Sequence, residues 1–214
     1  PLYSSAASDV YKRQDFIGHR VGILPFGSTG LVYRALLKKL NIDRSGITEV
    51  VVSPDLRSFI AASTHEVQPV FAYDETVTLE AQGISYTLID PRSYGVAFKG
   101  PCYFTTRETI ANSPEIVYAF VKSMAQGWAE AIRDPDRAIN FLKEADPRAD
   151  TRRELAVLKK GLPYFASPTR RPLQSDPNSW DSMLSDLVSF GVLKQRPDKA
   201  RFLDLSFVER FYKE

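Results

Sequence analysis

Hydrophobic and polar residues form a pattern that changes near the middle of the chain. In the first half, the short apolar runs at residues 20–24 and 49–53 flank a stretch with helical spacing. Leu31, Leu36 and Leu37 fall on one face of a helix predicted over residues 31–40. A strand, a helix and a second strand in that order indicate a parallel sheet and an α/β fold.

The same reading predicts further elements as far as Pro91. They are a helix over 54–62, a third strand over 67–73, a helix over 75–82 and a fourth strand over 86–89. Gly83 suits the left-handed position that ends a helix, and Pro91 cannot continue a strand. Residues 15–91 are therefore expected to form one compact, three-layer α/β lobe.

The second half of the chain is predicted to be mostly helical. Helices are expected to begin at Asn112-Ser-Pro-Glu, at Pro135, at Thr151 and at Asn178, with the third ending at Gly161 and the fourth at Gly191. These amphipathic helices have no sheet of their own, which suggests that strands supplied by upstream residues cover them. Residues 92–214 are expected to be a crossover followed by the C-terminal helices of an incomplete other lobe.

Residues 1–14 follow neither pattern. This stretch has no initiator Met, no apolar signal-peptide core and no helical or strand period. It has the features of a non-native tail left by the assembly of sequence data, and such segments belong outside fold reasoning. The natural chain is then expected to be cut at Asp15, with any targeting signal missing.

Composition and charge exclude several classes of protein. The chain has 214 residues, 43% hydrophobic and 25% charged, which is typical of a globular protein and excludes disorder. The chain has 28 Lys and Arg residues against 26 Asp and Glu residues, and the basic residues are scattered among the acidic ones. No basic stripe for nucleic-acid binding is therefore predicted. No apolar run approaches the length of a membrane span.

The residues that usually carry covalent or metal chemistry are sparse. Cys102 is the single cysteine, which excludes an internal disulfide, and it is expected to be a small buried apolar residue. His19 and His65 are expected at the surface, without a partner at metal-ligand spacing. No Gly-x-Ser-x-Gly or His-Glu-x-x-His motif is present, so neither an enzyme nor a metal or cofactor site is predicted.

Two segments have the chemistry of a ligand site. Gly27, Ser28, Thr29 and Gly30 lie between a predicted strand and a predicted helix, where backbone N–H groups and two hydroxyls converge. The alternative is an ordinary helix cap formed by Ser28 or Thr29. No lysine follows, so a phosphate-binding loop for nucleotide hydrolysis is not supported.

The second segment is Tyr73-Asp-Glu75, at the carboxyl end of the predicted third strand, where open α/β sheets bind ligands. A carboxylate there accepts a hydrogen bond from an amino group and repels a sulfonate or nitrate, which favours an aminopyrimidine stacked on Tyr73. The alternative is that Asp74 caps the next helix and Glu75 occupies its first turn. Tyr94 and Tyr103 are candidate stacking walls, or alternatively core residues.

Several phrases of the chain, in order, resemble the solute-binding proteins of bacterial ABC importers. They are Asp15-Phe-Ile-Gly-His-Arg-Val-Gly-Ile, Glu66-Val-Gln-Pro-Val-Phe-Ala-Tyr-Asp-Glu75, Asn112-Ser-Pro-Glu-Ile-Val-Tyr-Ala-Phe120 and Trp180-Asp-Ser-Met-Leu. The likeness is to the group that binds thiamine-pyrimidine precursors, nitrate, sulfonates and taurine. It implies a type II periplasmic-binding fold, truncated at its N-terminus, with residues 15–91 as the second lobe.

The resemblance also implies a function. An extracytoplasmic or periplasmic monomer would capture a small solute by lobe closure, with no cofactor, and deliver it to ABC permease subunits in the membrane. A thiamine-precursor-like aminopyrimidine is the preferred solute, with sulfonate, taurine or nitrate as alternatives. Two other classes stay open: a pyrimidine-precursor synthase of the same superfamily, which consumes its own histidine, and the effector domain of a transcription regulator.

Overall fold

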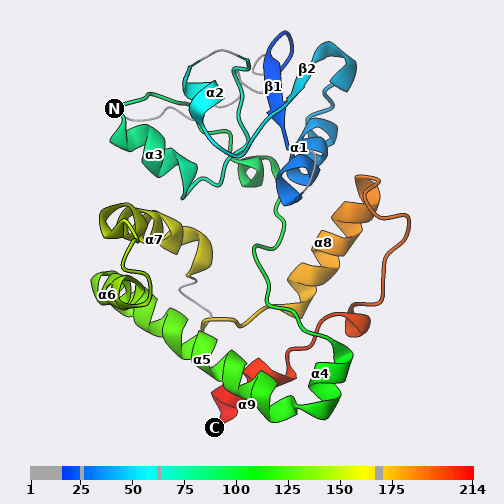
Figure 1. Ribbon diagram of the computed structural model, residues 1–214. Helices are drawn as coiled ribbons and strands as arrows, with labels where there is room; N and C mark the ends of the chain where they lie inside the picture. The colour runs from blue at the N-terminus through cyan, green and yellow to red at the C-terminus, as the bar shows by residue number, and fades with distance from the viewer. Residues whose placement is uncertain (1–15, 25–26, 62–63, 167–170) are drawn as a thin grey trace. The chain divides into compact units, whose positions relative to one another are not determined.

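The computed structural model describes residues 16–24, 27–61, 64–166 and 171–214 (Figure 1). These residues form two compact units. Unit 1 comprises the described part of residues 16–98 together with 186–194, and unit 2 comprises the described part of 99–185 together with 195–214. The expected non-native tail, residues 1–14, lies outside the described residues.

Unit 1 is built around a small parallel sheet. Strand β1 (Arg20–Ile23) pairs with β2 (Thr48–Val51), with Arg20 opposite Thr48 and Ile23 opposite Val51. On the other side of β1, Val21 forms a parallel bridge with Val67, and the Gly22 N–H donates to the Val67 carbonyl at 2.8 Å. The predicted parallel α/β arrangement is therefore confirmed in its coarse form, as a mostly helical chain with a small parallel sheet.

Two of the predicted strands are wrong. The strand expected over 67–73 is reduced to the bridge at Val67, because Pro69 has no N–H to donate to a ladder and residues 72–74 form a turn. Residues 84–90, which include the strand expected over 86–89, contain neither helix nor strand. The Tyr86 hydroxyl donates to Glu80 at 2.6 Å, so this segment is held by a side chain.

Helices and turns surround the sheet of unit 1. They are α1 (Ser28–Lys39), the 3-10 turn η2 (Arg44–Gly46), α2 (Arg57–Ile60), α3 (Glu75–Ala81) and the 3-10 turn η3 (Pro91–Tyr94). Leu36 and Leu37 on α1 are buried with Val21 of β1, as the hydrophobic spacing predicts. Gly83 follows α3 with a φ of 67°, which confirms the left-handed position expected there.

Unit 2 is helical in its described part. Its helices are α4 (Arg107–Asn112), α5 (Pro114–Arg133), α6 (Pro135–Ala145), α7 (Thr151–Phe165), α8 (Pro177–Ser189) and α9 (Ser206–Lys213), with the 3-10 turn η4 (Lys199–Arg201). The last four residues of α8 belong to unit 1. Helix α5 packs against both α6 and α9, and α6 packs against α7. Among the described helices, none is both long and apolar enough to cross a bilayer.

Side-chain caps explain where several helices of unit 2 begin. Thr106, Asp134 and Asp150 each accept a hydrogen bond from a backbone N–H in the first turn of α4, α6 and α7. The predicted starts of α6 and α7 are confirmed, whereas α4 and α9 had no predicted counterpart. Helix α7 also continues through Gly161 to Phe165, so the predicted end at Gly161 is wrong.

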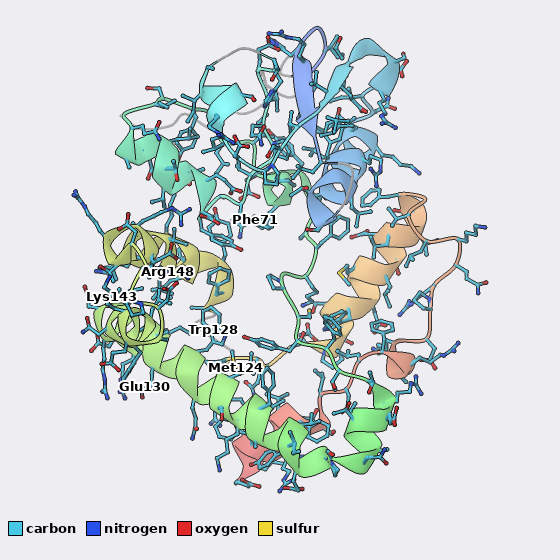
Figure 2. All side chains as sticks on the ribbon, in the orientation of Figure 1. Phe71, Met124, Trp128, Glu130, Lys143 and Arg148 are labelled. Atoms are coloured by element: carbon cyan, nitrogen blue, oxygen red, sulfur yellow. The ribbon has the colours of Figure 1, made fainter. Side chains whose placement is uncertain are left out.

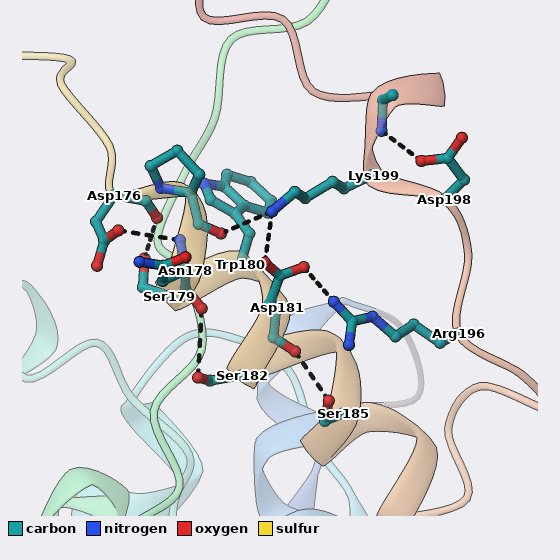
Figure 3. A network of polar contacts seen from close by, with 12 residues as sticks. Asp176, Asn178, Ser179, Trp180, Asp181, Ser182, Ser185, Arg196, Asp198 and Lys199 are labelled. Atoms are coloured by element: carbon teal, nitrogen blue, oxygen red, sulfur yellow. Dashed lines mark hydrogen bonds and ion pairs between the residues drawn. The ribbon is translucent and has the colours of Figure 1, made fainter.

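Charged side chains hold the C-terminal segment of unit 2. The Arg210 guanidinium of α9 lies 3.8 Å from the ring centre of Tyr118 and donates to Glu115 at 2.7 Å, both on α5. Figure 3 shows the second anchor, where the Asp181 carboxylate of α8 accepts from Lys199 at 2.5 Å and from Arg196. Arg196, Lys199 and Arg210 therefore attach the C-terminal segment of unit 2 to α8 and α5 by charge-assisted hydrogen bonds.

Candidate functional site

The start of α1 brings backbone donors to one point without a side-chain cap. Gly27 occupies the cap position with a φ of 91°, a conformation that favours glycine, and no side chain caps the helix. Ser28 and Thr29 are instead the first residues of the helix. The alternative interpretation, in which one of these hydroxyls is the cap, is therefore not what the structure shows.

Gly30 has a packing reason of its own. It is buried, and a β-carbon at this position would lie 2.9 Å from the Leu24 carbonyl oxygen, at the end of β1. Glycine at position 30 therefore allows the first turn of α1 to pack closely against the backbone at the end of β1. Ligand contact by Gly27, Ser28, Thr29 and Gly30 stays a prediction.

The turn before α3 concentrates aromatic and acidic groups. The rings of Phe71 and Tyr73 lie 5.9 Å apart, and the Phe71 side chain is 44% exposed. Figure 2 labels Phe71 in this part of unit 1. The Glu75 carboxylate accepts from the Phe71 backbone N–H at 2.7 Å, and the buried Thr76 hydroxyl donates to the Ala72 carbonyl at 2.6 Å. This turn is fixed by local hydrogen bonds, so its aromatic pair is held in place.

The electrostatics of this turn are negative. Asp74 stands at the cap position of α3 but its side chain makes no capping bond, and Glu75 occupies the first turn. Burial first, and then the charges of Asp74 and Glu75, raise the pKa of the Tyr73 hydroxyl. Such a corner suits a hydrogen-bond donor or a cation and disfavours an anion.

Tyr94 has a different setting from Tyr73. It lies in η3, which packs against α1, and its side chain packs against the buried cluster of unit 1. Asp90 holds this turn by accepting from the Arg92 backbone N–H at 2.9 Å and from its guanidinium at 2.7 Å. Tyr94 thus contributes to the core, which was the alternative interpretation, and a stacking role for it stays a prediction. The candidate residues occupy three separate segments of unit 1.

Unit 2 carries an aromatic cluster that the sequence indicated only in part. Its members, here called the aromatic cluster, are Tyr103, Phe120, Trp128 and Phe165. The sequence analysis predicts Tyr103 as a stacking wall or a core residue, whereas it assigns Phe120 and Trp128 to no site. Phe120, Met124 and Trp128 follow one another at intervals of four residues, which places them on one face of α5, and this spacing was the available signal. Figure 2 labels Met124 and Trp128 on this helix.

The two histidines differ in their surroundings. His19 is exposed, as expected, but His65 is only 2% exposed, so its expected surface position is wrong. Its Nδ1 lies 2.7 Å from the Thr64 hydroxyl and its Nε2 lies 2.5 Å from the Gln68 amide oxygen. Burial is possible because both ring nitrogens have hydrogen-bond partners.

In the described part of the chain, no group of three or more His, Cys, Asp or Glu side chains is arranged to hold a metal ion.

Cys102 is also placed differently from the expectation. The structure shows it exposed, in the irregular segment between η3 and α4, with its thiol 3.4 Å from the Gly100 carbonyl oxygen. The expected buried position is therefore wrong: residues 100–106 form no helix or strand and are all exposed.

Comparisons with known proteins agree with the resemblance. A family model described as NMT1/THI5 like matches residues 2–138, which include every candidate residue of unit 1 and three members of the aromatic cluster. The chain is also similar to the riboflavin-binding protein RibY of Chloroflexus aurantiacus, with 28% identity over 158 residues. That match covers 71% of this chain and 44% of the relative, so the chain spans less than half the length of this curated protein.

Proposed function

The chain belongs to the NMT1/THI5-like family, and from this membership we propose that it is part of an extracytoplasmic solute-binding protein of an ABC importer. The full-length protein captures a small solute by closing two lobes and delivers it, as a monomer, to permease subunits in the membrane. Residues 15–91 belong to the second lobe, and residues 92–214 form the crossover and C-terminal helices of the first. A division of the chain near residue 98 supports this organisation, whereas residues 186–194 belong to the same compact unit as the proposed second lobe.

The observation that carries the proposal is the turn before α3. An exposed aromatic side chain, Phe71, lies beside Tyr73, and two carboxylates follow directly. A flat ring with an amino substituent matches both features, because the ring stacks on the aromatic pair and the amino group donates to a carboxylate. Sulfonate, taurine and nitrate are disfavoured, because a like charge is repelled there.

The start of α1 complements this chemistry. The N–H groups of its first turn, with the Ser28 and Thr29 hydroxyls, supply donors for a ring nitrogen or an oxygen of the solute. Riboflavin, in the name of the relative from Chloroflexus aurantiacus, is likewise a flat nitrogen heteroaromatic compound. The proposed solute is therefore a pyrimidine-containing heteroaromatic compound, with an aminopyrimidine preferred.

Isothermal titration of the chain with four compounds tests this function. We expect binding of 4-amino-5-hydroxymethyl-2-methylpyrimidine and of riboflavin, and none of taurine or nitrate. Asp74→Asn and Glu75→Gln should weaken aminopyrimidine binding about tenfold, because each removes a charge-assisted acceptor. The matched control is Asp55→Asn, an exposed acid of unit 1 that precedes α2. Tighter binding of taurine or nitrate than of either heterocycle contradicts the proposal.

The synthase alternative finds less support. The matched relative is named a binding protein. In the synthase alternative the protein's own histidine is consumed, so its ring must be accessible to the other reactants. His65 is buried and bonded through both ring nitrogens, and Gly22 packs so closely that a β-carbon there would lie 3.0 Å from the His65 ring. The surroundings of His65 therefore favour a structural role.

A further inference from the structure

We propose that Gln68 is a specificity-determining residue of the solute site in unit 1, and that the buried His65 is the positioning residue that fixes its side chain. The Gln68 amide donates to a ring nitrogen of the solute, beside the amino group that a carboxylate of the same segment accepts. This inference rests on the proposed function and deepens it by naming a donor. It involves residues of unit 1 alone.

The place of Gln68 in the sheet is typical of a residue that contacts a ligand. Strand β1 lies between β2 and the bridge at Val67, so the chain leaves β2 and returns on the opposite side of β1. Open α/β sheets bind ligands at such a reversal of strand order, outside the carboxyl ends of the strands. Gln68 directly follows the bridge residue towards that end, and its side chain is partly buried.

Two neighbours fix the orientation of the Gln68 amide. The Ser53 carbonyl, which can only accept, lies 3.4 Å from the amide nitrogen of Gln68. The amide oxygen therefore faces His65, whose Nε2 lies 2.5 Å away and donates to it. Nδ1 of His65 then accepts from the Thr64 hydroxyl at 2.7 Å, which assigns one tautomer to the ring.

The His65 ring is in turn held by its surroundings. It is 2% exposed and packs against Phe59, with ring centres 5.8 Å apart. A β-carbon at Gly22 would lie 3.0 Å from the His65 ring, so glycine at this position of β1 leaves room for the imidazole. A fixed ring with a fixed tautomer preorganises the Gln68 amide, because the amide does not have to be reoriented when the solute binds.

One N–H of the Gln68 amide is left for the solute. The amide nitrogen carries two hydrogens, and within the described part of the chain only the Ser53 carbonyl accepts from it. A 4-aminopyrimidine has the matching acceptor, because a ring nitrogen stands beside the carbon that carries its amino group. Glu75, whose carboxylate bonds to the Phe71 backbone N–H at 2.7 Å, stands in the same segment and accepts from that amino group.

Isothermal titration with 4-amino-5-hydroxymethyl-2-methylpyrimidine tests the donor. Gln68→Leu removes the amide and should weaken binding about 2- to 10-fold, the effect of one lost hydrogen bond. Gln68→Glu keeps an acceptor for His65 but has no N–H, so it should weaken binding as much. Wild-type affinity in Gln68→Glu would mean that Gln68 only supports His65, and it overturns the inference. The matched control is Gln82→Leu, an exposed glutamine at the end of α3.

A change in the ligand locates the contact. In an analogue of the pyrimidine, C–H replaces the ring nitrogen beside the amino group, so this position cannot accept from Gln68. Wild type and Gln68→Leu should therefore bind the analogue equally, although they differ with the pyrimidine itself. If Gln68→Leu weakens binding of both compounds by the same factor, Gln68 does not donate to that nitrogen and the inference is wrong.

A double-mutant cycle tests the positioning role of His65. His65→Phe keeps a ring but frees the Gln68 amide, so it should also weaken binding of the pyrimidine. Because His65 acts through Gln68, the double variant His65→Phe/Gln68→Leu should bind no more weakly than Gln68→Leu alone. Losses that add would show that His65 acts independently of Gln68, which contradicts the positioning role. Urea unfolding of each variant sets conditions under which all of them are folded.

Failure of this inference is distinguishable from failure of the proposed function. Wild-type affinity for the pyrimidine in both Gln68 variants overturns the inference, while the proposed function stands. If the wild-type chain binds neither the pyrimidine nor riboflavin, the proposed function fails and the inference fails with it.

Discussion

The ring of Phe165 lies against the backbone of Gly161, one turn earlier in α7. A β-carbon at position 161 would overlap Cε2 of that ring, so glycine is required for the observed contact. Phe165 in turn contacts Trp128, with ring centres 5.5 Å apart. Gly161, which the sequence predicted to end the helix, thus lies within α7 and allows Phe165 of the aromatic cluster to pack against the helix backbone.

Gly161→Ala should therefore change the position of Phe165 in the aromatic cluster while leaving the free energy of unfolding almost unchanged. Alanine in a helix interior gains about 1 kcal/mol over glycine, whereas displacement of Phe165 from Trp128 loses about 0.5–1.5 kcal/mol. Phe165 is 37% exposed and can move, so the two effects nearly cancel. We expect an almost unchanged urea midpoint and a shifted Trp128 emission maximum, measured in a Trp180→Phe background. A loss above about 2 kcal/mol would show that the ring cannot move.

His65→Phe should destabilise the protein by about 1–3 kcal/mol, because it keeps the ring but leaves Gln68 and Thr64 without their partners. His19→Phe is the matched control: His19 is exposed, and its replacement should change the free energy of unfolding by less than about 0.5 kcal/mol. Urea unfolding at neutral pH measures both. Equal stability of the two variants would mean that the buried hydrogen bonds contribute nothing net.

Stability between pH 4.5 and pH 2 should depend on Glu66. Hydrogen bonds from the Arg20 guanidinium and then from its backbone N–H lower the pKa of Glu66 from 4.5 to about 2. Because the folded-state pKa is the lower one, the stabilisation is complete above pH 4.5 and is lost as the pH falls towards 2. Both side chains are about two-fifths exposed, so the effect is small and salt-sensitive.

Glu66→Gln keeps an acceptor for the Arg20 N–H and removes the charge. Its thermal midpoint should fall less than that of the wild type between pH 4.5 and pH 2. Glu144→Gln, an exposed acid on α6, is the control and should follow the wild-type curve. Identical curves for all three proteins would assign the acid sensitivity to other carboxylates.

Asp181→Asn should loosen the segment that follows α8. The hydrogen bond from Lys199 first, together with the charge of Arg196, lowers the pKa of Asp181, so the carboxylate is ionised at neutral pH (Figure 3). The variant should unfold at a lower temperature in low salt. In 1 M salt the difference should shrink, since the screening length falls to about 3 Å. Asp186→Asn, five residues later on α8, is the control, and an equal response of both variants contradicts the assignment.

Local chemistry explains which parts of the fold were predictable. Helices α5 and α6 begin at Pro114 and Pro135, as first-turn prolines indicate, and α7 begins at the predicted Thr151, where the structure adds Asp150 as the cap, because prolines and caps act within one turn. Parallel pairing of β1 and β2 followed from two short apolar runs with a helix between them. The strand expected over 67–73 failed, because sheet pairing also requires N–H groups and a neighbour, and Pro69 supplies no N–H.

The sequence by itself determined the family, the class of element in most segments, and the run of aromatic and acidic residues at 71–75, which the structure places in a turn and not at the end of a strand. Only the tertiary structure decided that His65 is buried, that Cys102 is exposed and that Gly161 lies inside a helix. It also decided that Tyr103 meets the α5 aromatic residues. The physical reason is that a side chain's burial depends on neighbours distant in sequence, whereas caps, turns and hydrophobic periods act over a few residues.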